Sequence, residues 1–259
     1  MSRLRAKCPD CRTLTAVALG GEYECHACGR VFSAGLVRVP RAWGKDGSAM
    51  AEAAFLPLPY HEAAVVEEES LAEQTLVLAA DLPDRPLVLG GCCCAHVGAV
   101  EGLASRADRL AVVWLDAHGD LNTPSTSPSG NAWGMPLRML LDDGALRVED
   151  VLLLGARSLD PPEEEFIASS GLATELSELP RVLEGADAVY VAVDVDVLEP
   201  GGDVEMFMPE PDGPDLTETE AALTRIAGSA PVAGAGFTGL TAAPENSAPL
   251  ARLAAALGL

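Results

Sequence analysis

Lysine and long apolar runs are scarce in this 259-residue chain. Lys7 and Lys45 are its only lysines, and 39 acidic against 17 basic residues give a formal charge of −22. Such acidity disfavours broad electrostatic binding to nucleic acid or to an anionic membrane, because both favour Lys and Arg. No apolar run approaches the roughly 18–20 residues that cross a bilayer, and no signal-peptide pattern opens the chain. We therefore expect a cytoplasmic protein that binds neither partner.

The negative charge is unevenly spread along the chain. Residues 1–38 contain six basic and three acidic residues, a net charge of +3, which leaves −25 for the remainder. Only this N-terminal segment therefore has the charge to face a polyanionic partner.

The seven cysteines form two groups. Cys8, Cys11, Cys25 and Cys28 make two C-x2-C pairs with thirteen residues between them, whereas Cys92, Cys93 and Cys94 are consecutive. Two C-x2-C turns bring four thiolates onto one ion, which is typical of a closed tetrahedral zinc site. So short a segment has almost no core to hold four unliganded thiols in place. The pattern predicts a zinc ribbon over residues 1–38, with one structural zinc ion, in a reducing compartment.

The rest of the chain is predicted to form one domain. Residues 39–60 are rich in Pro, Gly and Ala and indicate a linker, and the domain is expected over 61–259, with helical spacing from Glu62 to Ala80. Strands are predicted at 86–89, 111–115, 151–154, 188–193 and 232–237, and helices at 97–106, 134–141, 162–169, 217–227 and 249–257. Continuous apolar strands separated by helices indicate an α/β fold whose mainly parallel sheet is covered on both faces.

Acidic residues directly follow two of these strands. Asp116, His118 and Asp120 follow strand 111–115, and Asp194 and Asp196 follow strand 188–193. Alternate spacing puts each cluster on one side of an extended segment, at the sheet edge where ligands of parallel sheets bind. Caps and turns would explain a single cluster, but four carboxylates at one buried edge repel one another unless cations neutralise them. Two clusters therefore predict a Mn, Fe, Co or Zn site that can activate a nucleophile near neutral pH.

The segment WLDAHGDLNTPSTSPSGNAWGMPL resembles the signature of the ureohydrolase family, which includes arginase, agmatinase and formiminoglutamase. AVDVDVLEP and LVLGG share this likeness, which extends from about Leu87 to the C-terminus. The resemblance implies a three-layer α/β/α fold, a homo-oligomer and a dinuclear manganese site. It also implies hydrolysis of a guanidino or amidino C–N bond in a small molecule, an amino acid or amine derivative.

The resemblance also assigns roles to individual residues. Asp120 and His118 are the expected catalytic residues, with Asp120 accepting a hydrogen bond from the attacking nucleophile. The implied metal ligands are Asp116, His118, Asp120, Asp194 and Asp196. Asn122, Ser129 and Asn131 match positions that hold an α-carboxylate in arginases, and Asp160 matches one that contacts the α-amino group. Asn122 and Asn131 are equally good turn formers.

One departure from the family pattern affects the metal site. Cys93 stands where the family's GGDHS motif has its remaining metal-binding histidine. A thiolate there would favour zinc or iron over manganese, whereas the alternative is a small buried thiol in a tight turn. His96, about one helical turn later, is a second candidate ligand. The expected cofactors are one or two divalent cations in the pocket, manganese by resemblance and zinc or iron given Cys93.

Two further departures affect the substrate. Trp133 replaces a proton-shuttling histidine; its indole cannot accept a proton but can stack on a planar amidine, so we include it among the substrate-binding residues. Gly239 aligns with the glutamate that receives the guanidinium, and only a loop shift could bring Glu245 there instead. Without a counter-charge a cationic guanidinium is poorly held in a dry site. We therefore expect an N-hydroxyguanidino, formimino or amide-like substrate in place of arginine.

Two other functions are compatible with the same residues. A single zinc ion suffices for amide hydrolysis in the distant deacetylase relatives of the fold, and Cys93 makes a single-metal site conceivable. A non-catalytic ureohydrolase-like scaffold could act as a binding or regulatory protein, with its basic ribbon facing a partner. An enzyme should hold cations beyond the ribbon's zinc, whereas a degenerate scaffold should hold none.

Overall fold

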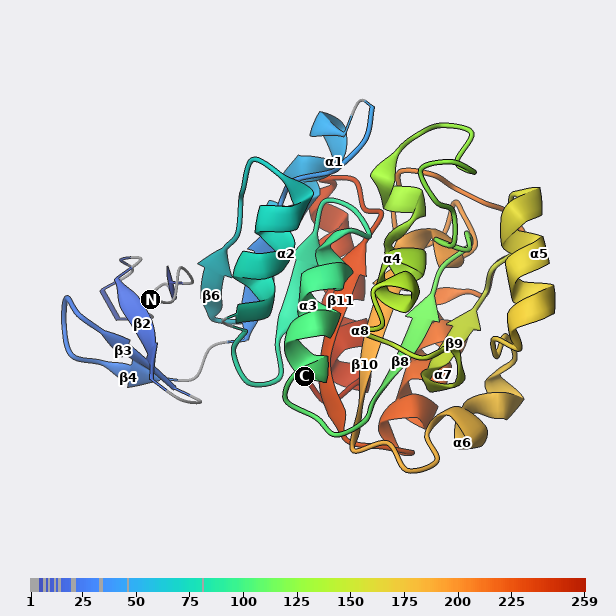
Figure 1. The fold of residues 1–259 in the computed structure, drawn as a ribbon. Coiled ribbons are helices and arrows are strands. Elements are labelled where there is room, and N and C mark those ends of the chain that lie inside the picture. Colours follow the sequence, from blue (N-terminus) through green and yellow to red (C-terminus); the bar gives the residue numbers. More distant parts are fainter. Residues whose placement is uncertain are drawn as a thin grey trace.

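The computed structural model describes residues 5–6, 8, 10–11, 13, 15–19, 22–32, 35–45, 47–80 and 82–259. A small N-terminal sheet precedes a large α/β unit (Figure 1). The small sheet is antiparallel, in the order β1 (Arg5–Ala6), β2 (Ala16–Leu19), β3 (Glu22–Cys25) and β4 (Val31–Phe32). Arg3, Lys7 and Arg12, which contribute to the predicted positive charge, lie outside the described residues.

Within the described residues the large sheet has seven parallel strands in the order β6-β5-β7-β11-β10-β8-β9. Their bounds are β5 (Leu36–Val39), β6 (Glu62–Val65), β7 (Leu87–Gly90), β8 (Leu110–Leu115), β9 (Val151–Leu154), β10 (Ala188–Asp194) and β11 (Val232–Thr238). Strand β8 is buried along its whole length and β10 from Val189 to Asp194, because helices cover both faces.

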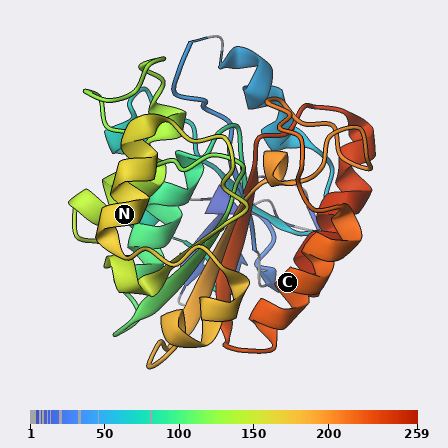
Figure 2. The ribbon, with the colours of Figure 1, turned by 90° about the vertical axis from the view of Figure 1, so that its right-hand side faces the viewer.

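The helices form the outer two layers, as the edge-on view shows (Figure 2). Their bounds are α1 (Ser48–Ala51), α2 (Leu71–Ala80), α3 (Ala95–Ala104), α4 (Pro136–Asp142), α5 (Pro161–Ser170), α6 (Leu179–Val182), α7 (Leu216–Ala227) and α8 (Ser247–Ala256). Strand β8 shows how the layers are built. Val112 and Trp114 face the core under α3 and α4, whereas Val113 and Leu115 face the core under α7 and α8. The three-layer α/β/α prediction is therefore confirmed.

The segment predicted as one helix from Glu62 to Ala80 was read wrongly in its first part. Glu62–Val65 is strand β6, which pairs with β5, and α2 begins at Leu71, where the Ser70 hydroxyl accepts a hydrogen bond from Glu73 N (3.2 Å). Ala and Glu favour helices, but pairing with a distant strand overrides this weak preference.

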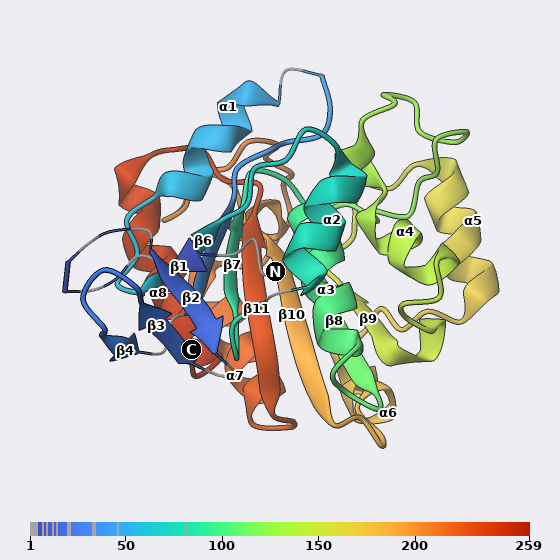
Figure 3. The ribbon, with the colours of Figure 1, turned by 60° about the vertical axis from the view of Figure 1, so that its left-hand side comes forward.

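The predicted boundary between residues 38 and 39 falls inside β5, which pairs in the large sheet with β6 and β7, both labelled in Figure 3. Arg38 is buried there, and its guanidinium binds Glu62 Oε2 (2.5 Å) and the Leu56 carbonyl (3.0 Å). Residues 39–60, predicted as a linker, contain α1 and the 3₁₀ turn η1 (Glu52–Phe55), with Met50 and Ala53 buried. The folded unit therefore starts earlier than composition indicated. None of the helices in the described part of the chain is both long and apolar enough to cross a membrane.

Candidate active site and metal groups

A pocket of about 260 Å³ opens where β7, β8 and β10 end. All the residues predicted for the metal or substrate site line it except the two alternatives His96 and Glu245: Cys93, Asp116, His118, Asp120, Asn122, Ser129, Asn131, Trp133, Asp160, Asp194 and Asp196. β10 lies between β8 and β11, so the two acidic clusters leave the sheet side by side. The parallel topology thus brings together residues that are far apart in the sequence.

The first group of candidate ligands centres on His118. Its Nδ1 lies 2.9 Å from Asp196 Oδ2 and 3.4 Å from Asp116 Oδ1. Backbone amides hold both carboxylates, since Asp116 Oδ1 accepts from His118 N (2.7 Å) and Asp196 Oδ1 from Ala117 N (3.0 Å). One ligand atom each of Asp116, His118 and Asp196 lie within 4.8 Å of one another.

The second group lies deeper and contains Cys93, Asp116 and Asp120, again with ligand atoms within 4.8 Å of one another. Cys93 Sγ is 2.8 Å from Asp194 Oδ2 and 3.9 Å from Asp116 Oδ2. Asp116 belongs to both groups, and Asp194 contacts Cys93 and, through Oδ1, the Asp196 amide (3.1 Å). The arrangement therefore offers two adjacent cation positions that share carboxylates.

Burial and repulsion between neighbouring carboxylates determine the electrostatics of the cluster. Burial raises the pKa of Asp194 to about 7 and that of Asp196 to about 6. Burial and the neighbouring Asp116 raise the pKa of Asp120 well above its usual range. Burial lowers the pKa of His118, but its hydrogen bonds to Asp116 and Asp196 outweigh this effect and raise it to about 12. Without cations the carboxylates therefore resist ionisation, and the imidazole holds a proton.

Asp120 provides the clearest test of whether cations fit. Its side chain is buried, and Oδ2 has no hydrogen-bond partner among the described residues. The residue also adopts a left-handed backbone conformation (φ 53°), which is uncommon outside glycine. A buried carboxylate oxygen without a partner is costly unless it binds a cation or a proton. The donor set and this oxygen fit divalent metal ions.

A polar wall faces the metal groups. Asn122 donates from Nδ2 to Asp160 Oδ2 (2.8 Å), and Asn131 Oδ1 accepts from Lys45 N (2.8 Å). Trp133 packs so closely on Gly44 that a Cβ there would lie 2.3 Å from its ring. The segment predicted as a linker therefore supports this wall, and Met50 from α1 lines the pocket as well.

Sequence reasoning missed Glu163. It lines the pocket, its Oε1 accepts from Leu121 N (2.9 Å) and its Oε2 from Asp160 N (3.0 Å). Asp160 and Glu163 form a capping box at the start of α5, with Pro161 at the first helical position. A D-P-P-E sequence that runs from the N-cap into the first turn of a helix is a recognisable capping signal, so the pattern could have drawn attention to Glu163.

The loop between Glu205 and Asp215 supplies two further residues without a sequence signal. Met208 lines the pocket, and Glu210 Oε1 lies 3.7 Å from His118 Nε2, the ring nitrogen that points away from the metal groups. Arg157 holds this loop against the end of β10. Its guanidinium donates to the carbonyl oxygens of Gly155, Asp196, Val197, Glu210 and Pro211 at 2.7–3.2 Å.

Three candidates behave differently from the others. His96 is fully buried, with Nδ1 3.0 Å from the Tyr190 hydroxyl and Nε2 3.4 Å from Thr238 Oγ1, so both ring nitrogens already have partners and it joins neither metal group. Glu245 is exposed in the 3₁₀ turn η6 (Pro244–Asn246) and does not line the pocket. Gly239 has φ 73°, and a Cβ there would lie 1.8 Å from Asp194 Oδ1. This backbone therefore has no room for a side chain at position 239.

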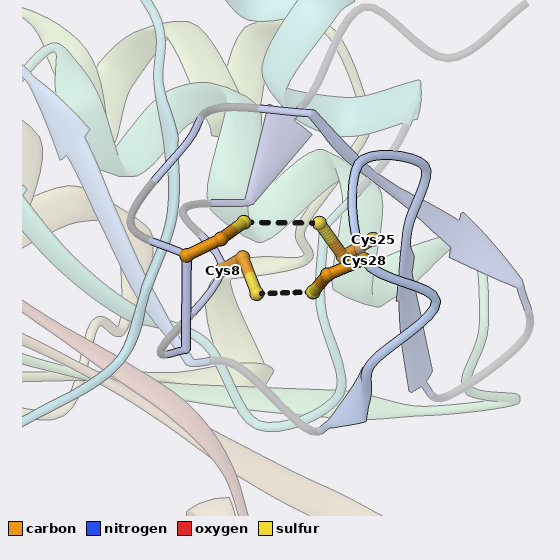
Figure 4. A group of neighbouring side chains, drawn as sticks. Cys8, Cys25 and Cys28 are labelled. Carbon is orange, nitrogen blue, oxygen red and sulfur yellow. Dashed lines mark hydrogen bonds between the residues drawn. The ribbon is translucent and has the colours of Figure 1, made fainter.

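The ribbon cysteines form a separate group. The sulfurs of Cys8 and Cys28, and those of Cys11 and Cys25, lie 3.5 Å apart (Figure 4). A disulfide would require about 2.05 Å, whereas a tetrahedral zinc ion with bonds of roughly 2.3 Å separates its sulfurs by about 3.8 Å. The hydrogen bond from Thr15 lowers the pKa of Cys25 to about 5, which favours the thiolate. We propose that these four sulfurs hold the structural zinc.

Comparisons with known proteins agree with the geometry. The model of the arginase family matches residues 46–258. Arginase from Bacillus caldovelox is 33% identical over 198 residues, covering 66% of each chain, and arginase from Bacillus subtilis is 35% identical over 166 residues, covering 54% of this chain and 56% of the relative. The chain thus spans about half to two thirds of the length of these relatives.

Solved structures show the same fold. Arginase from Bacillus subtilis superposes with a TM-score of 0.75 at 24% identity, covering 86% of this chain and 97% of that one. Formimidoylglutamase from the same species (TM-score 0.67, 19% identity, covering 87% of each chain) and proclavaminate amidino hydrolase from Streptomyces clavuligerus (0.64, 18%, covering 86% and 90%) are also similar.

Proposed function

Because this chain belongs to the arginase family, we propose that it is a metal-dependent hydrolase of a C–N bond in a small guanidino, hydroxyguanidino, formimino or related amidine or amide compound. One observation carries the proposal: two adjacent, buried groups of candidate ligands share Asp116 at the floor of a pocket with a polar wall. A homo-oligomeric assembly is part of the proposal, on the resemblance alone.

The chemistry follows from the positions of the side chains. Cys93, Asp116, His118, Asp120, Asp194 and Asp196 would hold one or two divalent cations. Such ions act as Lewis acids and lower the pKa of bound water. Asp120 would bind a cation through one carboxylate oxygen and accept a hydrogen bond from an attacking water, and then its proton, at the other. His118 Nδ1 faces Asp116 Oδ1 and Asp196 Oδ2, so the imidazole would join these two carboxylates in holding a cation.

The far wall suits an amino acid or amine derivative. Ser129 and Asn131 offer hydrogen-bond donors to a carboxylate, whereas Asp160 and Glu163 offer acceptors to an ammonium group. Asn122 is bound to Asp160, so one substrate could contact both. These contacts would orient the scissile carbon toward the metal groups.

The reacting end is unsuited to the guanidinium of arginine. A carboxylate cannot be added at position 239 without displacing Asp194, and Glu245 remains outside the pocket. Trp133 offers a flat ring in place of a proton acceptor. We infer that the substrate's reacting group is less basic than guanidinium, as in hydroxyguanidino, formimino or amide compounds.

A substrate screen with full-length protein tests the function. Guanidino, hydroxyguanidino, formimino and acetylamino compounds are incubated with Mn²⁺, Zn²⁺ or Fe²⁺, and urea, ammonia or acid release is measured. Turnover of one class is expected, and Asp120→Asn should reduce kcat by about 10²–10⁴-fold. Asp84→Asn, an exposed aspartate outside the pocket, is the matched control and should be unchanged.

Each other outcome contradicts part of the proposal. Efficient arginine hydrolysis would refute the argument from Gly239 and Trp133. Turnover of acetylamino compounds alone, with one ion per pocket, would indicate a deacetylase. No turnover of any class, with no cation beyond the ribbon's zinc, would indicate a non-catalytic scaffold.

A further inference from the structure

We propose that the two cation positions are chemically unequal: the position beside Cys93 selects a thiophilic ion such as Zn²⁺, Fe²⁺ or Co²⁺, and the position beside His118 accepts Mn²⁺. The inference deepens the proposed function, because it rests on the same metal pocket. It predicts a mixed-metal centre where the resemblance alone implies two identical ions.

The three consecutive cysteines do not share one environment. Cys93 lines the pocket, with Sγ 2.8 Å from Asp194 Oδ2. Cys92 and Cys94 pack with Met50 in a separate apolar cluster, and Cys92 Sγ accepts a hydrogen bond from Trp43 N (3.4 Å). Filling a tight turn with small side chains explains two of these residues. It does not explain a thiol placed among carboxylates.

The imidazoles are distributed unequally between the two positions. His118 Nδ1 faces Asp116 and Asp196, so one position combines a nitrogen with carboxylate oxygens. His96 cannot supply the other position, because its nitrogens contact Tyr190 and Thr238. The deeper position therefore combines sulfur with the oxygens of Asp116 and Asp120, without a nitrogen ligand among the residues described.

Two observations besides the thiol indicate that an ion belongs at the deeper position. Asp120 Oδ2 is buried and unpartnered in the described structure. Thr238 Oγ1 lies 3.1 Å from Asp194 Oδ2 and 3.3 Å from Cys93 Sγ, and so orients both groups from outside the site. Outer partners of this kind commonly fix the direction of metal ligands.

Ligand softness then determines the preference. Thiolate binds zinc and iron strongly, whereas oxygen ligands suit manganese. Cys93 would bind as the thiolate and release its proton to solvent. Nitrogen and oxygen sites also bind Zn²⁺ more tightly than Mn²⁺, so the decisive quantity is how much the preference changes when the sulfur is removed.

The test compares wild type with Cys93→Ser, and with Cys94→Ser as the matched control. Full-length proteins are equilibrated with Zn²⁺ in a large excess of Mn²⁺, and bound ions are counted. Electron paramagnetic resonance then distinguishes isolated from coupled Mn²⁺. Wild type and Cys94→Ser should hold one pocket Mn²⁺ with the signal of an isolated ion. Cys93→Ser should lose at least about tenfold in its preference for zinc and show a coupled manganese pair.

Cobalt gives a second readout that does not depend on turnover. After the ribbon is filled with Zn²⁺, Co²⁺ in the pocket should give a near-ultraviolet sulfur-to-cobalt charge-transfer band in wild type and in Cys94→Ser, but not in Cys93→Ser. Two coupled Mn²⁺ ions in wild type despite available zinc, or a band that survives Cys93→Ser, would overturn the proposal.

Failure of this proposal and failure of the function are separable. If the protein turns over a substrate but holds two coupled Mn²⁺ ions, only the proposed difference between the two cation positions is refuted. If the protein gives the predicted spectra but turns over no substrate, only the proposed hydrolase reaction is refuted. If Cys93→Ser loses the native circular-dichroism spectrum, the variant is not folded. The count of ions bound to the wild-type protein then tests the proposal, because it needs no variant.

Discussion

The described part of the chain contains two groups of candidate metal ligands that differ in character. In the ribbon, four sulfurs from residues 8–28 surround one point and leave no position open. In the pocket, mixed ligands come from the ends of β7, β8 and β10, with 101 residue positions between Cys93 and Asp194, and they face a cavity. A closed set of ligands can only stabilise a fold, whereas an open set can also present an ion to a substrate. Ligands that are close in the sequence therefore suit a structural metal site, whereas ligands that a sheet brings together suit a site open to substrate.

The largest effect that the comparison predicts is that each group can lose its metal ions while the other group keeps them. Asp116→Ala removes the carboxylate common to both pocket positions, so the pocket should lose its cations while the ribbon keeps its zinc. Activity should fall at least about 10³-fold, because several kcal/mol of charge stabilisation are lost. Metal analysis and rate measurements check this.

The reciprocal variant sharpens the same prediction. Cys25→Ser should release the ribbon zinc and leave the pocket ions in place. If either variant empties both groups, the two are coupled and the comparison breaks down.

Gly239→Ala should have the next largest effect. The new methyl group must displace Asp194, and misplacement by about 1 Å can reduce activity by roughly 10²-fold. Gly171→Ala is the control: its φ of 77° imposes the same strain of about 1–2 kcal/mol, but no atom lies within 4 Å of the new methyl group. Both should unfold earlier in urea, and only Gly239→Ala should lose metal and activity. Equal activity in the two variants would refute this account.

Glu210→Gln should have a smaller effect. A carboxylate on the outer nitrogen of a metal-binding histidine fixes the ring, and its loss typically costs about 10–100-fold; the 3.7 Å separation places Glu210 at the lower end. Titration of Mn²⁺ into the pocket measures the change. Glu245→Gln removes the same charge from an exposed residue outside the pocket, so it should leave the affinity for Mn²⁺ unchanged. A similar loss in both would indicate a general effect of charge.

The smallest effect concerns pH. Burial raises the pKa of Asp194 to about 7 and that of Asp196 to about 6, whereas burial lowers the pKa of His118 but hydrogen bonds to Asp116 and Asp196 outweigh it and raise that pKa to about 12. Without pocket cations the folded state therefore binds more protons than the unfolded chain and gains stability as the pH falls from 8 to about 6.5. With cations bound, protons compete with the metal, and the same change should lower stability.

Urea unfolding followed by tryptophan fluorescence measures both signs, because all three tryptophans lie in the large unit. The same sign with and without added metal would mean that cations bind elsewhere.

Local and periodic signals in the sequence predicted most of the fold. The ribbon motif lies within about 20 residues, and the five apolar strands predicted correspond to β7–β11. Strand β5 was missed because the predicted ribbon boundary divides it, and β6 was missed because its Ala and Glu residues favour a helix until pairing with β5 overrides that weak preference. The acidic clusters were predictable because each follows its strand directly.

The rest of the pocket depends on long-range packing. Met208 and Glu210 lie in a loop without periodicity, and Met50 lies in a segment whose composition indicated a linker. Which ring nitrogens of His96 are occupied depends on Tyr190 and Thr238, more than ninety residues away. The roles of the site residues therefore remain predictions, although their positions are now known.

Arg157 has a consequence for how this pocket can change. It holds the loop beside the pocket only through carbonyl oxygens, which every amino acid provides. Side chains on that loop can therefore be exchanged while its path is preserved, so the rim could acquire new selectivity by single substitutions that leave the catalytic floor undisturbed.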